Sequence, residues 1–202
     1  SRLQSSFAFH KSRLYIPKEM TFEDYFDECM KYEAGLPTDK ALSEWCLRVP
    51  DCGKYYKHLS DFQLTDPNDI TLVTFDELSQ NPSNVLLNMC NKLNLDSNFY
   101  NHYSFAKSNV TTGHKNDKMQ KIALTVNKTL ESFWIKYPAT KRNLLTIYRK
   151  LNGAPKEKIT LSDTLRQKLF NYYYEDLIKL RENKSINQMV ENWISSLKLV
   201  EK

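Results

Sequence analysis

The stretch ITLVTF at residues 70–75 is the one segment of the chain with the character of a β-strand. It is rich in β-branched residues, apolar at nearly every other position and flanked by turn-forming residues. The sequence DELSQNP follows at residues 76–82, and an amphipathic helix is predicted through about residues 85–93. A strand, a short connection and a helix make up the unit of an α/β fold, so this stretch decides the predicted fold class.

One strand cannot form a sheet, because its backbone groups would remain unpaired on both edges. The missing strands could be weakly patterned segments of this chain, could precede Ser1, or could belong to a second chain. Residues 1–12 already have helical spacing, as if the sequence began inside an element. This favours strands that precede Ser1. We expect one domain over residues 1–202, since no linker, repeat or low-complexity tract interrupts it.

The rest of the chain has mainly helical periodicity. Thr21 is expected to cap a helix through Met30, and Asn152-Gly153 is expected to stop another. Residues 98–117 lack a strong period and form a polar, basic loop. Further helices are predicted at about residues 39–47, 53–65, 119–137, 141–151, 162–182 and 185–197.

Composition narrows the function classes. The chain has 202 residues, 41% of them hydrophobic, and a net charge of +5, which fits a domain with a real core and excludes disorder as its main state. No apolar run approaches the roughly 18 residues of a membrane span. Lysines are scattered rather than arranged in a stripe with exposed aromatics, so nucleic acid is not an expected partner.

The cysteines do not have the spacing of a zinc site, and no metal is expected. Cys46 and Cys52 flank a turn and could close a small disulfide loop in an oxidising compartment, the alternative being free buried thiols. N-x-S/T sequons occur at Asn109, Asn127 and Asn183, as a lumenal protein would allow.

Several short motifs become informative through their order and spacing. They are SRLQSSF at 1–7, GKYYKHL at 53–59, ITLVTFDEL at 70–78, NPSNV at 81–85, a basic loop near 107–115, and LRQKLFNYYYEDLIKL at 165–180. Together they resemble the C-terminal portion of sulfotransferases that use 3'-phosphoadenosine 5'-phosphosulfate, especially the carbohydrate class such as the heparan sulfate N- and O-sulfotransferases. The resemblance covers about residues 1–100 and 155–195, so the helical stretch at about 117–153 is interpreted as an insertion.

The resemblance implies a helix-rich α/β fold of the P-loop-like sulfotransferase type. In that family an R-x-P-x-x-R-x-x-S element binds the 3'-phosphate of the nucleotide, and Arg2 and Ser5 match its inner arginine and its serine. The alternative for Arg2 is a structural ion-pair arginine, and the alternative for Ser5 is a helix serine bonded to its own backbone. The phosphosulfate-binding loop, the catalytic base and the first arginine of that element would precede Ser1. A catalytic residue is therefore not assigned.

The resemblance also suggests where the remaining contacts would lie. The loop containing Gly113, His114 and Lys115 occupies the place of the family's basic loop over the cofactor, with Lys107 as the alternative to Lys115. Backbone N–H groups beside a glycine, together with an ammonium group, suit a phosphate. Tyr55 and His58 would border the acceptor cleft. A solvated surface loop and a surface histidine are the simpler alternatives.

The predicted function is transfer of a sulfonate group from 3'-phosphoadenosine 5'-phosphosulfate to a hydroxyl or amine, with a glycan as the expected acceptor. The expected product nucleotide is 3'-phosphoadenosine 5'-phosphate. The family likeness favours the Golgi lumen over the cytoplasm. The alternative function is a non-enzymatic helical binding module that keeps a degenerate sulfotransferase scaffold.

Overall fold

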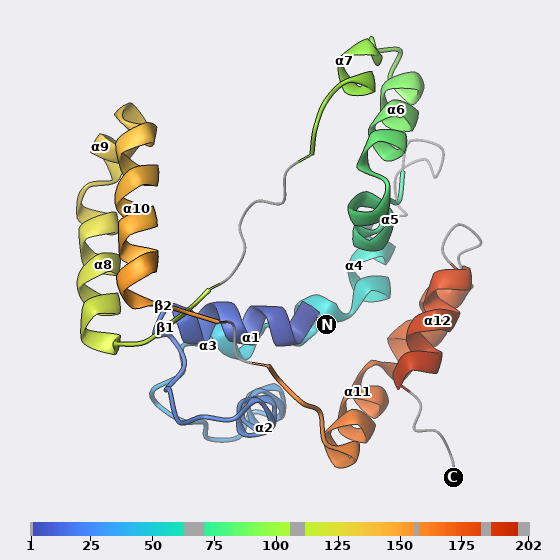
Figure 1. Cartoon of the computed structure of the whole chain (residues 1–202). Helices are drawn as coiled ribbons and strands as arrows, with labels where there is room; N and C mark the ends of the chain where they lie inside the picture. Colours follow the sequence, from blue (N-terminus) through green and yellow to red (C-terminus); the bar gives the residue numbers. More distant parts are fainter. Residues whose placement is uncertain (1, 63–70, 106–111, 156–157, 183–186, 198–202) are drawn as a thin grey trace.

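The protein is rich in helices joined by short irregular segments, as the computed structural model shows for residues 2–62, 71–105, 112–155, 158–182 and 187–197 (Figure 1). The first half of the described chain contains α1 (Arg2–Ser12), α2 (Phe22–Glu33), α3 (Glu44–Leu47), the 3₁₀ turn η1 (Asp51–Gly53), α4 (Tyr55–Phe62), α5 (Phe75–Gln80), α6 (Pro82–Lys92) and α7 (Asn98–Asn101). The second half contains β1 (Gly113–His114), α8 (Asp117–Thr129), α9 (Glu131–Lys136), α10 (Pro138–Asn152), β2 (Gly153–Ala154), α11 (Asp163–Arg181) and α12 (Asn187–Leu197).

The predicted strand at residues 70–75 is wrong within the part of the chain that the structure describes. Residues 71–74 form no ladder, and Phe75 begins α5. The Thr74 hydroxyl accepts from the Glu77 N–H while the Glu77 carboxylate accepts from the Thr74 N–H. This capping box starts a helix at the point where β-propensity predicted a strand to continue. Among the described residues the sheet consists of β1 and β2, an antiparallel pair of two residues each.

The main core lies where α1, α2 and α11 meet. Phe7 of α1 packs edge-on against Phe22 and beside Tyr25 of α2, with ring centroids 5.4 and 5.3 Å apart. Leu165 and Leu169 of α11 complete this buried cluster. Because α11 follows α2 by some 130 residues in the chain, this packing fixes two distant parts of the sequence against each other.

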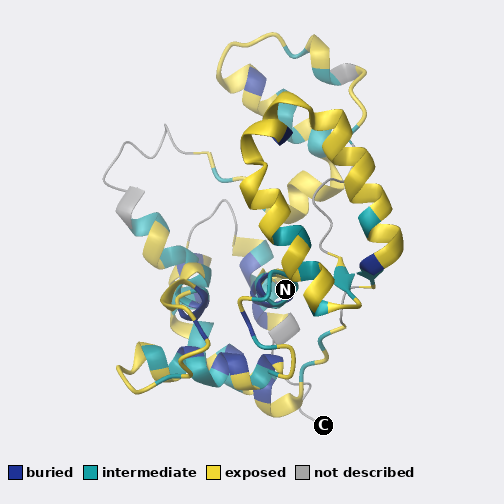
Figure 2. Cartoon of the chain, turned by 90° about the vertical axis from the view of Figure 1, so that its left-hand side faces the viewer, coloured by how far each residue is buried: buried dark blue, intermediate teal, exposed yellow. Residues whose placement is uncertain are grey.

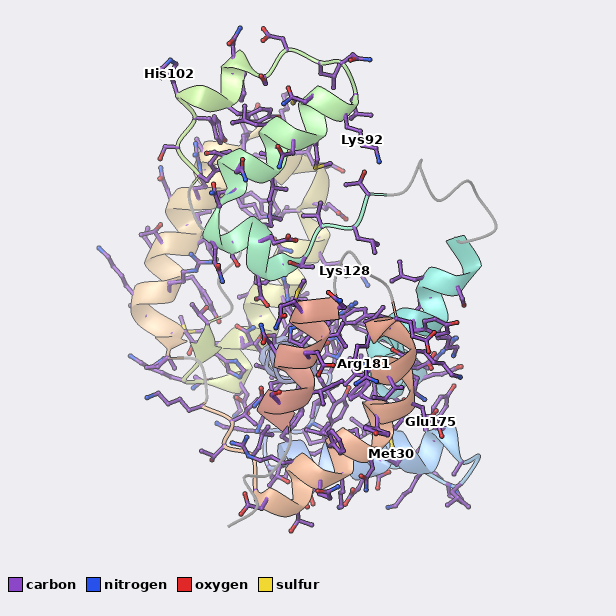
Figure 3. The ribbon with its side chains drawn as sticks, turned by 90° about the vertical axis from the view of Figure 1, so that its right-hand side faces the viewer. Met30, Lys92, His102, Lys128, Glu175 and Arg181 are labelled. Carbon is purple, nitrogen blue, oxygen red and sulfur yellow. The ribbon has the colours of Figure 1, made fainter. Side chains whose placement is uncertain are left out.

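A second apolar cluster joins α4, α11 and α12. Leu177 and Leu180 of α11 pack on Val190 and Ile194 of α12, with tyrosines of α4 against them. Arg181, labelled in Figure 3, pairs with Glu191 at 3.2 Å across the same helices. Phe170, Tyr172 and Tyr173 pack against these two clusters, whereas Tyr174 is exposed.

Two helical units extend from this core, one made of α5–α7 and the other of α8–α10 (Figure 1). Their helices are largely exposed, as the yellow ribbons of Figure 2 show. The α8–α10 unit is held at its base by Asn152, whose buried amide donates to and accepts from the backbone of Asn116. It occupies the stretch interpreted as an insertion.

Local signals located most helices correctly. Thr21 and Asp24 form the capping box of α2, which confirms Thr21 as its cap. The predicted helix at residues 39–47 is reduced to α3, since residues 40–42 form a turn and a bend and Ser43 is the N-cap. The predicted helix at residues 119–137 is divided at Leu130 into α8 and α9. The start of the helix predicted at residues 185–197 and residues 106–111 of the basic loop lie outside the described residues.

Candidate functional site

One face of α1 carries the two residues that resemble the 3'-phosphate element. Arg2, Ser5, Ala8 and Ser12 follow one another at intervals of three or four residues, so they share a face of the helix. Leu3 and Phe7 on another side are buried in the core. The core therefore anchors α1 from one side and leaves Arg2 and Ser5 exposed on another.

The first end of this face meets α4. The Arg2 guanidinium lies 5.5 Å from the centroid of the Tyr55 ring. A hydrogen bond with the Tyr55 side chain raises the pKa of Arg2, so the guanidinium stays charged. The structure thus brings together a residue assigned to the nucleotide and a residue assigned to the acceptor.

The second end of the α1 face meets the predicted cofactor loop. Ala8, Lys11 and Ser12 line a cavity of about 150 Å³ together with residues 112–114. Gln120, just beyond the loop, donates from Nε2 to the Ser12 carbonyl at 2.6 Å. The loop and the serine-bearing helix are therefore neighbours, although about a hundred residues separate them in the sequence.

A larger depression of about 400 Å³ lies beside this cavity. Lys11 and Lys18 line both hollows, and Lys158 lines the larger one. Its rim also carries the hydroxyls of Thr21, Thr160 and Ser162, with Glu19 and Glu23 as the acidic members. Ammonium and hydroxyl donors in one concave region suit an anionic ligand.

The three predicted loop residues have different environments. Gly113 and His114 form β1, and His114 Nε2 lies 2.8 Å from Asp117 Oδ1. A Cβ on Gly113 would lie 2.8 Å from the Pro155 carbonyl oxygen, so the close approach of the two strands requires glycine. The Lys115 side chain is exposed, and its N–H donates to the Asn152 carbonyl. Lys107 lies outside the described residues.

His58 does not join the loop cavity. Its side chain is exposed on α4, and Nε2 lies 3.2 Å from the Asp51 carbonyl oxygen. Lys57 pairs with the Asp51 carboxylate at 2.8 Å, and this contact lowers the pKa of Asp51. His58 is therefore a surface residue beside an ion pair, on the same helix as Tyr55.

Sequence reasoning missed Asp176 of α11. Its two carboxylate oxygens accept from the N–H groups of Tyr56 and Lys57, each at 3.0 Å. A carboxylate at the first turn of a helix accepts from backbone N–H groups that have no partner within the helix. Its negative charge also interacts favourably with the positive end of the helix dipole. Asp176 thereby positions the helix that carries Tyr55 and His58. A capping partner 120 residues away leaves no local signal.

Two tyrosines of α11 contact the turn that precedes α4. Burial raises the pKa values of Tyr172 and Tyr173 well above the ordinary range, so both phenols stay protonated. Tyr173 donates to the Pro50 carbonyl at 3.0 Å, while the Lys54 ammonium lies 4.1 Å from the Tyr172 ring centroid. These contacts stiffen the turn that precedes α4.

Cys46 and Cys52 are free thiols in this structure, Cys46 buried and Cys52 exposed. Asn127 is exposed on α8, whereas the other two sequons lie outside the described residues. Among the described residues, no three His, Cys, Asp or Glu side chains gather in a way that could hold a metal ion. No described helix is long and apolar enough to cross a bilayer.

Comparison of the chain with protein-family models, curated proteins and solved structures gave no match.

Proposed function

We propose that this chain is the part of a sulfotransferase that binds the 3'-phosphate end of 3'-phosphoadenosine 5'-phosphosulfate and forms one wall of the acceptor cleft. The observation that carries the proposal is the contact between α1 and the loop before α8. Ala8, Lys11 and Ser12 of α1 line one cavity with Gly113 and His114 of the basic loop, whereas Arg2, Ser5 and Lys115 lie outside its lining. The resemblance assigns α1 and this loop to one nucleotide, and no local pattern forces them to lie together.

The chemistry assigned to these residues is binding and positioning. In sulfonate transfer the acceptor oxygen or nitrogen forms a bond to sulfur as the bond from sulfur to the nucleotide's phosphate oxygen breaks. The added negative charge develops on the 5'-phosphate of the released nucleotide, whereas Arg2 and Ser5 are assigned to the 3'-phosphate, so their role is to hold the nucleotide in position. The acceptor also loses a proton to a base, and that role is assigned to no residue of this chain. The sulfotransferase fold and a glycan acceptor are parts of this proposal.

A helical binding module is the second candidate. It is favoured by the helix start at Phe75 and by the small size of the sheet in the described residues. The two candidates differ in one property, because only the first requires affinity for the nucleotide.

Nucleotide binding is tested by thermal unfolding of the full chain with 3'-phosphoadenosine 5'-phosphate. At one hundred times the dissociation constant, the nucleotide should stabilise the protein by about 2.7 kcal/mol. Adenosine 5'-phosphate, which lacks the 3'-phosphate, should stabilise it less at the same concentration. Equal effects of the two nucleotides, or no effect of either, would reject the proposed site and favour the binding module.

Ser5→Ala identifies the phosphate contact. Loss of one hydrogen bond to a charged phosphate should weaken nucleotide binding by about 1–3 kcal/mol and leave the helix content unchanged. Ser195→Ala on α12 is the matched control, since that serine is also exposed on a helix and lies outside α1. Unchanged affinity of the Ser5 variant would remove Ser5 from the site.

A further inference from the structure

The positive charge of the chain is concentrated in the α8–α10 unit. Residues 117–152 contain eight Lys or Arg side chains against Asp117 and Glu131, a net charge of +6, so the rest of the chain has a net charge of −1. The eight basic residues are Lys118, Lys121, Lys128, Lys136, Lys141, Arg142, Arg149 and Lys150, and all are exposed. A surface with this charge attracts an anionic partner.

The same helices also expose apolar side chains in regular stripes. Met119, Ile122 and Val126 are spaced by three and four residues along α8, so they lie on one face. Leu144, Ile147 and Leu151 repeat that spacing along α10 and are likewise exposed. Exposed apolar side chains that line one face of a helix mark an interaction surface.

The tip of the unit combines both properties. Phe133 and Tyr137 lie with ring centroids 4.8 Å apart, and the Lys136 ammonium is 5.5 Å from the Tyr137 ring. Trp134 is buried beneath them, whereas Ile135 is 79% exposed. In Figure 1 this end of the unit, around α9, points away from α1 and β1. Lys128, at the end of α8 next to α9, is also exposed and is labelled in Figure 3.

An anionic lipid surface fits this combination better than the other anionic partners. A soluble polyanion would use the ammonium and guanidinium groups but has no use for aliphatic side chains such as Ile135. An acidic protein segment would need a groove, and neither of the two hollows described above is lined by residues 117–152. A bilayer interface accepts aliphatic and aromatic side chains at headgroup depth while its anionic lipids attract Lys and Arg.

We propose that the α9 tip of this unit docks on an anionic membrane surface, with Ile135 inserted at the interface and the neighbouring lysines on the lipid headgroups. This peripheral contact is independent of the proposed nucleotide site, since α1 and the loop cavity lie at the opposite end of the α8–α10 unit.

The experiment measures co-sedimentation of the full chain with vesicles of phosphatidylcholine and phosphatidylserine in equal parts, and with vesicles of phosphatidylcholine alone. Binding is expected for the mixed vesicles and should decrease as salt is added. Ile135→Ser should weaken it roughly tenfold, because an inserted aliphatic group is lost. Its matched control is Phe75→Ser, which removes an equally exposed side chain, 80%, from the other helical unit.

The electrostatic part is tested with Lys136→Glu, which should weaken binding roughly tenfold or more. Lys40→Glu makes the same change of net charge at an exposed position far from the tip and should have little effect. Circular dichroism checks that each variant keeps its helices. Absence of binding to the mixed vesicles, or equal losses for the tip variants and their controls, would overturn the proposal. So would a loss with Lys136→Glu but not with Ile135→Ser, combined with release by soluble polyglutamate, since that result indicates a polyanion site.

Discussion

The ring of Tyr173 on α11 lies directly against the Cα of Gly53, at the end of η1. A methyl group on that carbon would be 2.9 Å from the Tyr173 hydroxyl oxygen and 3.0 Å from Cε1. The same hydroxyl donates to the Pro50 carbonyl at 3.0 Å. Gly53, which begins the GKYY motif, is therefore required by the packing of a tyrosine 120 residues further along the chain.

Gly53→Ala should destabilise the protein by about 1–3 kcal/mol, because the added methyl group forces apart η1 and α11. Urea unfolding measures the change. In a Tyr173→Phe background the hydroxyl is absent, so the same substitution should cost less. An equal cost in both backgrounds would show that the contact with Tyr173 is not the cause.

Asp176→Ala should lower the free energy of unfolding by about 1–2 kcal/mol, since the first turn of α4 loses the acceptor of two N–H groups. Asp176→Asn keeps one side-chain acceptor and should lose less. Thermal unfolding of the two variants gives the comparison. Equal destabilisation by Asp176→Asn and Asp176→Ala would mean that the carboxylate stabilises the helix terminus through its charge alone. The loss of stability in both variants should then be smaller at high salt.

The contrast between α2 and α5 shows how far local sequence predicts this fold. Both helices begin with a Thr and an acidic residue three positions later, and both form a capping box. At Thr21 the apolar residues that follow have helical spacing, so all local signals agree. At Thr74 the β-branched residues before it indicate a strand, whereas Thr74 and Glu77 together indicate a helix start. Two competing local patterns met at one residue, and the helix start prevailed.

The candidate site was predictable only in part. Arg2, Ser5 and the loop at residues 113–115 were assigned from motif order, and the structure brings α1 and that loop together. The role of Asp176 and the closeness of Gly53 to Tyr173 depend on tertiary contacts across 120 residues, for which a single sequence carries no periodic or compositional signal. The exposed stripes of α8 and α10 were recognisable as amphipathic, but the sequence does not tell whether such a face is covered.

His10 should make stability depend on pH. Its ring is buried against Trp45 with centroids 4.2 Å apart, and burial lowers its pKa from the ordinary 6.5. The unfolded chain therefore binds a proton that the folded chain resists, so this contribution to stability is fully present above pH 6.5 and is lost as the pH falls through the lowered pKa. His10→Phe should weaken the acid-side loss when urea midpoints are compared between neutral and mildly acidic pH. His58→Phe, at an exposed histidine, is the control and should leave the profile unchanged.

Asn152 should be the most sensitive position of the α8–α10 unit. Its buried side chain accepts from the Asn116 N–H at 2.8 Å, donates to the Asn116 carbonyl at 3.2 Å and donates to the Tyr148 hydroxyl at 2.7 Å. Removal of the amide leaves the backbone N–H and carbonyl of Asn116 without these partners, so Asn152→Ala should cost about 2–3 kcal/mol. Asn143→Ala, at an exposed position of α10, is the matched control and should cost under about 0.5 kcal/mol.

The consequence of that loss should be local, because the contacts of Asn152 fix the base of the unit and not the main core. Hydrogen exchange should become faster for α8 and α10 in the Asn152→Ala variant, while the amides of α2 and α11 stay protected. Faster exchange throughout the molecule would contradict this, since it would mean that the α8–α10 unit and the α1–α2–α11 core unfold as one cooperative body. If the two parts unfold separately, the effect of an α9 variant on membrane binding can be measured without a change at the proposed nucleotide site.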